Sequence, residues 1–223
     1  MQSEKILVIS DIHLGSPVLR ADALLELLDK KWQQIIVNGD LLDSGKFHRY
    51  TKKHWKILSK LRKISKHTPV RLIEGNHDRE ARVLVEILGL EYLSNLTLEI
   101  GLRKILFVHG DQFDSFISKH PIITEVAANI YYMLQRMGLS KSLCRKIKES
   151  SKQWMDASEI LANRSLAHIA GTDITDICVG HSHHATSRSI PYHNYWNSGT
   201  FCDDPSNYLV ICTNTGSIQL LQT

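Results

Sequence analysis

The chain has 223 residues, of which 43% are hydrophobic and 22% charged, and its formal net charge is +4. This composition is typical of a folded globular protein and excludes a disordered polyelectrolyte. It also excludes a membrane span, because no run approaches the roughly 20 apolar residues that a transmembrane helix needs. We expect one domain, 1–223, in the cytoplasm, since the apolar run at 6–9 ends at Asp11, too early for a signal peptide.

Five segments share a pattern in which a short apolar, β-branched run precedes polar residues. They are the segments 6–13, 34–40, 70–78, 105–111 and 176–183. Such runs predict strands that are buried on both faces. Helical patterns occupy 20–31, 46–67 and 79–89. The alternation predicts an α/β fold with a largely parallel sheet, on which ligands gather at the carboxyl ends of the strands.

The second half of the chain changes character. Residues 116–170 are compatible with helices and show little strand pattern, with Gly171 at their end. We interpret this segment as a helical insertion that lies over the site as a lid. Strands resume at 192–199, 207–213 and 217–222, the last two joined by a turn at 214–216.

The four cysteines have no CxxC spacing, and two of them lie within predicted strands. We therefore expect free thiols in a reducing compartment rather than disulfides. They are Cys144, Cys178, Cys202 and Cys212.

The positive charge is concentrated in one segment. Residues 46–67 contain nine Lys and Arg and no acid, which leaves 18 basic against 23 acidic residues elsewhere. A stripe that includes Phe47, Tyr50, His54 and Leu58 is expected to face the core. The surrounding cations form either a solvated face or a contact with an anionic partner: a membrane, a phosphorylated substrate or, less favoured, nucleic acid.

Polar motifs follow the predicted strands, where the ends of neighbouring strands meet. Side chains two apart on an extended segment point the same way, so Asp11 and His13 are expected to converge. A mixture of carboxylate, imidazole and amide donors suits Mn²⁺, Fe²⁺ or Zn²⁺ better than Mg²⁺ or Ca²⁺. The motifs are Asp11-Ile12-His13, Gly39-Asp40-Leu41-Leu42-Asp43, Gly75-Asn76-His77-Asp78, His109 and Gly180-His181-Ser182-His183. The glycines in them are expected to permit tight turns and close backbone approach.

This ordered set resembles the signature of calcineurin-like metallophosphoesterases, DxH, GDxxD, GNH(D/E), H and GHxH. The resemblance implies a four-layer α/β/β/α sandwich with two divalent ions, Mn²⁺ being expected first and Fe²⁺ or Zn²⁺ as alternatives. It implies that the first ion is held by Asp11, His13, Asp40 and His183. The second is then held by Asp40, Asn76, His109 and His181, with Asp40 as the bridge.

Two ions of this kind activate a water and clamp the oxygens of an in-line displacement at phosphorus. The leaving oxygen needs a proton, and His77, adjacent to a ligand, is the expected general acid. The resemblance implies that the carboxylate of Asp43 orients His77, and Asp78 is a further catalytic candidate. Expected substrate contacts are Asn76, Arg79, Tyr131 and Arg164.

The substrate is open at this stage. The His109-Gly110-Asp111 continuation and the helical insertion resemble UDP-2,3-diacylglucosamine hydrolases, which cleave a pyrophosphate in lipid A synthesis at the membrane. This implies a lipid-linked substrate and a position peripheral to the inner membrane. The best-known members carry Arg where this chain has His77, so a small nucleotide or cyclic-nucleotide phosphodiesterase is the alternative. A non-catalytic scaffold of the same fold is a remote second alternative.

Three further features have two interpretations each. Asp111 and Asp114 belong to the site or cap the next helix. The segment 197–200, Asn-Ser-Gly-Thr, is a structural turn or a substrate contact. His184 is expected to point away from its neighbour His183 and not to bind metal.

Overall fold

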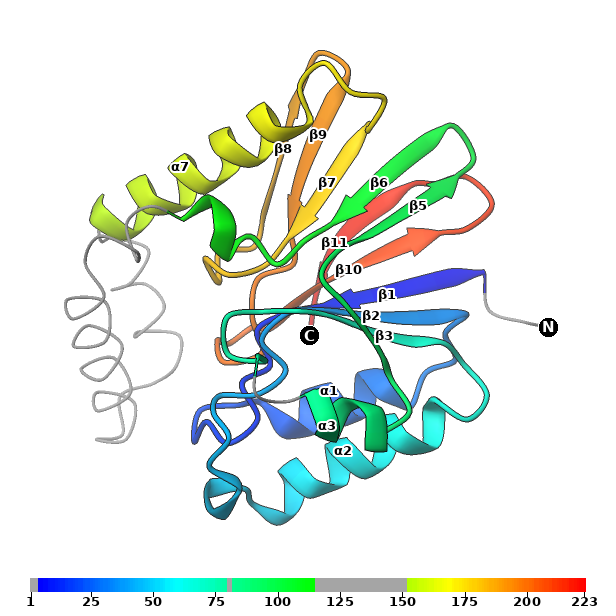
Figure 1. The fold of residues 1–223 in the computed structure, drawn as a ribbon, viewed down its shortest axis with the longest axis vertical. Helices are drawn as coiled ribbons and strands as arrows, with labels where there is room; N and C mark the ends of the chain where they lie inside the picture. The colour runs from blue at the N-terminus through cyan, green and yellow to red at the C-terminus, as the bar shows by residue number, and fades with distance from the viewer. Residues whose placement is uncertain (1–3, 80–81, 115–151) are drawn as a thin grey trace.

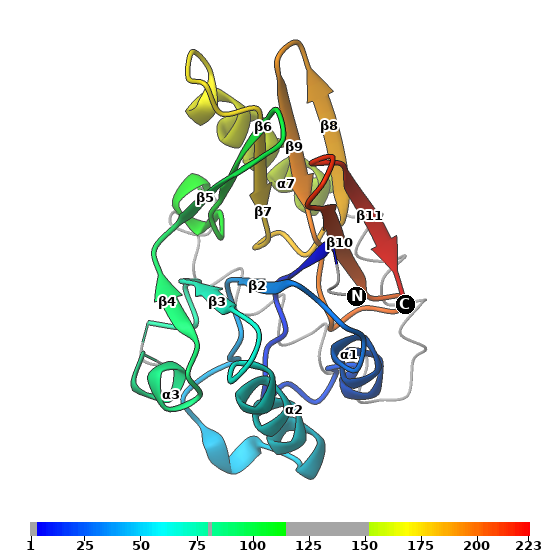
Figure 2. The same ribbon diagram turned by 90° about the vertical axis from the view of Figure 1, so that its right-hand side faces the viewer.

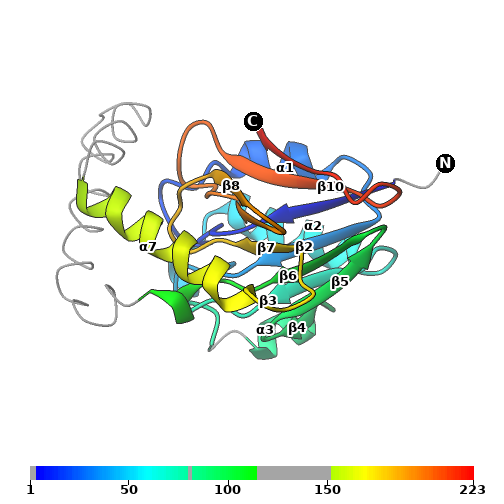
Figure 3. The ribbon, with the colours of Figure 1, turned by 90° about the horizontal axis from the view of Figure 1, so that it is seen from above.

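A computed structural model describes residues 4–79, 82–114 and 152–223 and contains two β-sheets that pack face to face between helices (Figure 1). Helices cover the outer side of the first sheet, and a longer helix covers the outer side of the second (Figures 2 and 3). The predicted four-layer α/β/β/α arrangement is confirmed. The helices are α1 (Ala21–Leu28), α2 (Lys52–Ile64), α3 (Arg82–Ile87) and α7 (Lys152–Ile169), with short 3₁₀ turns η1 (Phe47–Arg49) and η2 (Asp111–Phe113).

The first sheet has the strand order β11-β10-β1-β2-β3-β4. Its strands are β1 (Lys5–Ile9), β2 (Gln34–Asn38), β3 (Val70–Ile73), β4 (Glu91–Leu93), β10 (Asn207–Cys212) and β11 (Ile218–Gln222). β1 to β4 are parallel, and β10 and β11 are antiparallel to their neighbours. Leu7 packs with the helices, whereas Val8 packs toward the second sheet. This two-sided burial explains the continuous apolar runs.

The second sheet has the order β5-β6-β7-β9-β8. Its strands are β5 (Leu96–Ile100), β6 (Arg103–Phe107), β7 (Asp176–Val179), β8 (Thr186–Ile190) and β9 (His193–Asn197). The three central strands are parallel, and β5 and β8 run antiparallel at the edges. β4, β5 and β8 were not predicted, because these short or half-exposed strands lack a continuous apolar run. The expectation of a largely parallel sheet therefore holds for the centres of the sheets and is wrong for several edge strands.

The predicted helix 46–67 is divided into two parts. The turn η1 ends at Tyr50, whose backbone is extended, and Thr51 then caps α2 through a capping box with His54. His54 and Leu58 are buried, so most of the apolar stripe faces the core as expected. Phe47 is the exception, because 40% of its surface is exposed.

Helix α7 covers the second sheet and ends before Gly171, which adopts a left-handed conformation. Leu161 and Leu166 pack with Val179 and Tyr195, which confirms the helical character of the last part of the predicted insertion. The rest of that insertion, including Tyr131 and Cys144, lies outside the described residues. The other three cysteines are free thiols, as predicted. No helix in the described ranges is long and apolar enough to span a membrane.

Candidate metal centre

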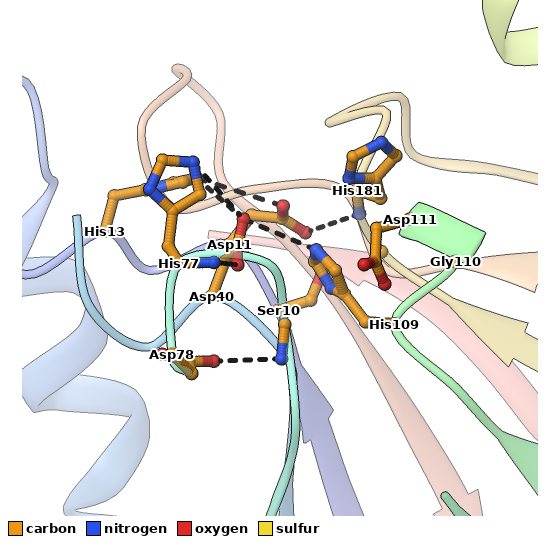
Figure 4. Close-up of polar contacts among 12 residues, drawn as sticks. Ser10, Asp11, His13, Asp40, His77, Asp78, His109, Gly110, Asp111 and His181 are labelled. Atoms are coloured by element: carbon orange, nitrogen blue, oxygen red, sulfur yellow. Dashed lines mark hydrogen bonds and ion pairs between the residues drawn. The ribbon is translucent and has the colours of Figure 1, made fainter. Parts of the chain in front are cut away.

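The two sheets direct the polar motifs to one edge of the sandwich (Figure 4). Each motif follows the carboxyl end of a strand, and the loops continue the pairing of β1 with β2. The amide of Asp11 donates to Gly39 O at 3.1 Å, and the amide of His13 donates to Asp40 O at 3.0 Å. The strand ends are therefore held together where their side chains must meet.

The predicted ligands converge on a small volume. His13 Nε2 and His183 Nε2 are 3.1 Å apart, and His183 Nε2 is 3.2 Å from Asp11 Oδ1. Asp40 Oδ2 lies 3.3 Å from His109 Nε2 and 3.8 Å from His13 Nε2. Among the residues that the structure describes, three overlapping groups could hold an ion, each with its donor atoms within 4.8 Å of one another. They are Asp11–His13–His183, His13–Asp40–His77 and Asp11–Asp40–His109.

Each of the two central carboxylates has one oxygen fixed and the other directed to the centre. The amide of His181 donates to Asp11 Oδ2 at 3.1 Å, and the amide of His77 donates to Asp40 Oδ1 at 3.0 Å. Asp11 Oδ1 and His109 Nε2 are buried, and among the described residues neither makes a well-aligned hydrogen bond, although His183 Nε2 and Asp40 Oδ2 lie 3.2 and 3.3 Å away. A buried polar atom without a partner costs about 1–3 kcal/mol. A divalent cation would satisfy these atoms, and the carboxylate and imidazole donors suit Mn²⁺, Fe²⁺ or Zn²⁺.

Electrostatics favours the metal-binding forms of His13 and Asp40, but it favours the protonated form of His109. Burial lowers the pKa of His13 to about 3, so its ring stays neutral. Burial alone would raise the pKa of Asp40. The neighbouring rings of His109 and His13 lower it by more, so the pKa of Asp40 lies well below its usual range. Burial lowers the pKa of His109 but Asp40 raises it more, to about 10. Metal binding at His109 therefore competes with a proton.

The backbone at the ligands is left-handed, where an extended path was expected. Six non-glycine residues in the described ranges have positive φ, and five of them are predicted ligands. These five are Asp11 (51°), His13 (50°), Asp40 (53°), His181 (64°) and His183 (56°). Such a conformation costs about 1–2 kcal/mol per residue. The side chains therefore converge because the chain turns at each ligand, and not because alternate residues of an extended strand point the same way.

Three motif glycines allow the backbone to approach the ligands closely. A Cβ on Gly39 would lie 2.1 Å from Nδ1 of His109, and one on Gly75 would lie 2.3 Å from Oδ1 of Asp40. A Cβ on Gly180 would lie 2.5 Å from Oδ2 of Asp11. At Gly75 and Gly180 the added Cβ would clash with the carboxylate oxygen that accepts a hydrogen bond from a neighbouring backbone amide. The predicted role of these glycines is confirmed.

His77 lies at the rim of the centre, as expected. Its Nδ1 is 2.8 Å from the backbone oxygen of Asp43, and its Nε2 is 4.0 Å from Asp40 Oδ2. The backbone carbonyl of Asp43 therefore orients the ring. The expectation that the Asp43 carboxylate does so is wrong. That carboxylate pairs with Arg49 Nη1 at 2.8 Å.

Asp78 supports the centre from below. Its carboxylate accepts from the amides of Leu41 at 3.3 Å, Leu42 at 3.1 Å and Gly75 at 3.2 Å. Burial and then the Asp40 charge raise the pKa of Asp78 to about 7, although the amides of Leu42 and Leu41 act to lower it. The contacts make Asp78 a positioning residue for the loops that carry Asp40 and Asn76.

Two predicted ligands are less directly placed. The ring of His181 lies 5.2 Å from that of His109, but its Nε2 is 3.1 Å from Asp114 Oδ2. Asp114 therefore belongs to the site. Asn76 is exposed in the turn after β3, next to His77. It is adjacent to the centre without being part of the three groups.

The comparisons with known proteins agree with this geometry. Residues 4–194 match the family described as calcineurin-like phosphoesterase. The chain belongs to this family. A search of curated proteins found no match. None of the comparisons distinguishes the UDP-2,3-diacylglucosamine hydrolase subgroup.

Solved structures of the calcineurin-like phosphoesterase fold are similar over nearly the whole chain. A novel archaeal phosphodiesterase has a TM-score of 0.53 at 15% identity, covering 98% of this chain and 99% of that one. The phosphoesterase YfcE from E. coli has a TM-score of 0.51 at 16% identity, with 97% and 98% covered. Vps29 from Entamoeba histolytica, complexed with zinc, has a TM-score of 0.51 at 16% identity, with 98% of each chain covered. At these identities the likeness shows a common fold.

In this member of the family, helix α7 borders the candidate metal centre. Trp154 Nε1 donates to Ser182 O at 3.1 Å, and its ring lies 4.9 Å from that of His184. Arg164, a predicted substrate contact, donates to Phe113 O at 3.0 Å and thereby joins α7 to η2. The described part of the insertion thus lies beside the site, and Arg164 has a structural partner there.

Arg79 and Tyr131 are the other predicted substrate contacts. Arg79 is exposed and reaches toward Glu74 at 3.7 Å and Asp111 at 3.5 Å. It stays a candidate for contact with a substrate phosphate. Tyr131 lies outside the described residues.

The segment 197–200 is a structural turn. Asn197 Nδ2 donates to Gly180 O at 2.7 Å, and Thr200 Oγ1 donates to Asp11 O at 2.8 Å. These buried bonds tie the turn to both loops that supply the ligand pair Asp11 and His183 to the centre. The sequence left this role open, because the bond between Thr200 and Asp11 joins residues 189 positions apart.

Proposed function

We propose that the chain hydrolyses a phosphodiester or phosphoanhydride bond at a centre of two divalent ions, with Mn²⁺ the first to test. The main support is that Asp40 belongs to two candidate metal-binding groups, one with His13 and one with His109. Such ions, when bound, supply an activated water and neutralise charge on the phosphoryl oxygens. The ions would be held as the resemblance implies: one by Asp11, His13, Asp40 and His183, the other by Asp40, Asn76, His109 and His181.

His77 is the proposed general acid. Its ring is 41% exposed, so a leaving oxygen can approach Nε2 from the solvent side. When Nδ1–H donates to Asp43 O, that bond is compatible with the ring both before and after Nε2 gives up its proton. The orientation of His77 therefore does not need to change during the transfer.

A lipid-linked nucleotide pyrophosphate is the substrate class that we propose first. It is supported by the His109-Gly110-Asp111 motif and by the position of α7 beside the centre. A small nucleotide phosphodiester is the second candidate, and it is supported by His77, since the best-known lipid pyrophosphatases of this type carry Arg at that position.

The test is the kcat/KM of purified protein with Mn²⁺ on three substrates: UDP-2,3-diacylglucosamine, a cyclic nucleotide and bis(p-nitrophenyl) phosphate. Preference for the first supports the lipid-linked class, and preference for the second transfers the proposal to nucleotides. Asp40→Asn should abolish activity on all three, whereas the exposed variant His67→Asn should match the wild type. Hydrolysis of none of them, with the metals bound, would support the scaffold alternative and contradict the proposal.

A further inference from the structure

Helix α2 presents three differently occupied sides. The inner side, which includes His54 and Leu58, is buried against the first sheet. On one flank, Lys53 and Lys60 form ion pairs with Asp22 and Asp29, which lie at the two ends of α1. The cations of this flank are therefore explained by contacts within the protein.

The outer side of α2 carries cations that these contacts leave unused. At 100° per residue, Lys52, Lys56 and Lys63 lie opposite the buried side, and all three are exposed. No carboxylate in the described ranges lies within ion-pair distance of them. We call these three residues the outer lysines. Lys52 and Lys56 are four positions apart, where like charges on a helix repel.

Exposed aromatic side chains adjoin the outer lysines at the start of α2. Phe47 is 40% and Trp55 is 48% exposed, with their ring centroids 6.4 Å apart. Tyr50 packs against both, at 5.3 and 5.4 Å. We call Phe47, Tyr50 and Trp55 the aromatic tip. It lies beside Arg49, whose partner Asp43 holds His77 at the rim of the metal centre.

We propose that the outer lysines and the aromatic tip bind the surface of an anionic lipid bilayer. Cations beside exposed aromatic rings are the combination that binds a negatively charged interface, because the rings enter the headgroup region while the ammonium groups remain at its surface. The outer side of a helix is convex and suits a broad surface, whereas single-stranded nucleic acid binds in grooves. The proposal concerns binding and does not depend on the substrate that is hydrolysed.

Docking through the aromatic tip would bring the adjoining Arg49 to the membrane surface. Arg49 pairs with the carboxylate of Asp43, and the backbone oxygen of Asp43 holds the rim residue His77. A lipid-linked substrate would then approach the centre from the side of this pair. This consequence rests on the proposed function, whereas vesicle binding itself does not.

Cosedimentation with vesicles tests the proposal, with phosphatidylcholine and phosphatidylglycerol in equal parts against phosphatidylcholine alone. The matched variants are Lys52→Gln/Lys56→Gln and Lys53→Gln/Lys60→Gln, which change the same helix by the same charge. Each cation near an anionic surface contributes about five-fold in binding, so the outer pair should lose about 25-fold. The flank pair should lose about five-fold or less. Phe47→Ser/Trp55→Ser should weaken binding at high salt as well as at low salt.

Equal losses in the two lysine pairs would overturn the proposal, because net charge would then suffice. No binding of the wild type to the anionic vesicles at low salt would also overturn it. Tighter binding to a single-stranded oligonucleotide, with the same dependence on Trp55, would replace the bilayer with nucleic acid. Thermal unfolding of each variant checks that it is folded. Because no substrate is present, none of these outcomes depends on hydrolysis.

Discussion

Replacement of His77 by Ala tests the proposed proton transfer. General acids contribute about 10²–10⁴-fold to a rate. The ring is 41% exposed and its Nε2 lies 4.0 Å from Asp40 Oδ2, so water can occupy part of its place in the variant. We therefore expect the lower end of that range, about 10²-fold or close to 2.7 kcal/mol, for a phosphodiester with a poor leaving group. An activated aryl ester hardly needs the proton and should lose about tenfold or less.

The assay is kcat/KM over a series of phosphodiesters with graded leaving groups, at saturating Mn²⁺. The logarithm of kcat/KM should fall more steeply with leaving-group pKa in His77→Ala than in the wild type. The amount of bound metal should be unchanged. As a control, His67→Ala changes an exposed histidine just after the end of α2 and should give the same kcat/KM values as the wild type. A loss of the same size across the whole series would refute the reasoning and indicate that His77 binds the phosphate.

Three more predictions follow from contacts at the centre. Gly39→Ala places a Cβ at 2.1 Å from the His109 ring, so metal binding measured by calorimetry should weaken at least about tenfold; unchanged affinity would contradict this. Asp43→Asn retains the carbonyl that holds the general acid, so kcat/KM on the poor leaving group should fall less than about tenfold. A loss equal to that of the His77 variant would show that the carboxylate is required. Asp78→Asn loses at least one of three amide bonds and should be destabilised by about 1–3 kcal/mol in urea unfolding. Unchanged stability would contradict its positioning role.

The sequence predicted the layers of the fold because its buried strands are short apolar runs with polar ends. β1 and β2 are examples, since both of their faces are covered. β5 was missed because its residues alternate between exposed and partly buried, which is a weak signal in five residues. The division of the predicted helix 46–67 depends on the extended backbone of Tyr50, a conformation that periodicity does not reveal.

At the site, the sequence predicted the side chains that converge but not the contacts that position them. A motif marks His77 and Asp43, yet only the structure shows that the carbonyl of Asp43 orients the ring. The same holds for Asp114, which meets His181 across 67 positions of the chain. Such partners depend on how the loops after neighbouring strands, β2 with β3 and β6 with β7, approach one another, and no local pattern encodes that.

The most direct test of the account is the number of metal ions bound per chain, measured by elemental analysis after Mn²⁺ loading and gel filtration. We expect two ions for the wild type. Asp40→Ala should bind none or one with strongly reduced affinity, because one carboxylate is shared by both groups. Asp22→Ala, which removes an exposed carboxylate at α1, should still bind two. Two tightly bound ions in Asp40→Ala, or fewer than two in the wild type under saturating Mn²⁺, would contradict a dinuclear centre bridged by Asp40.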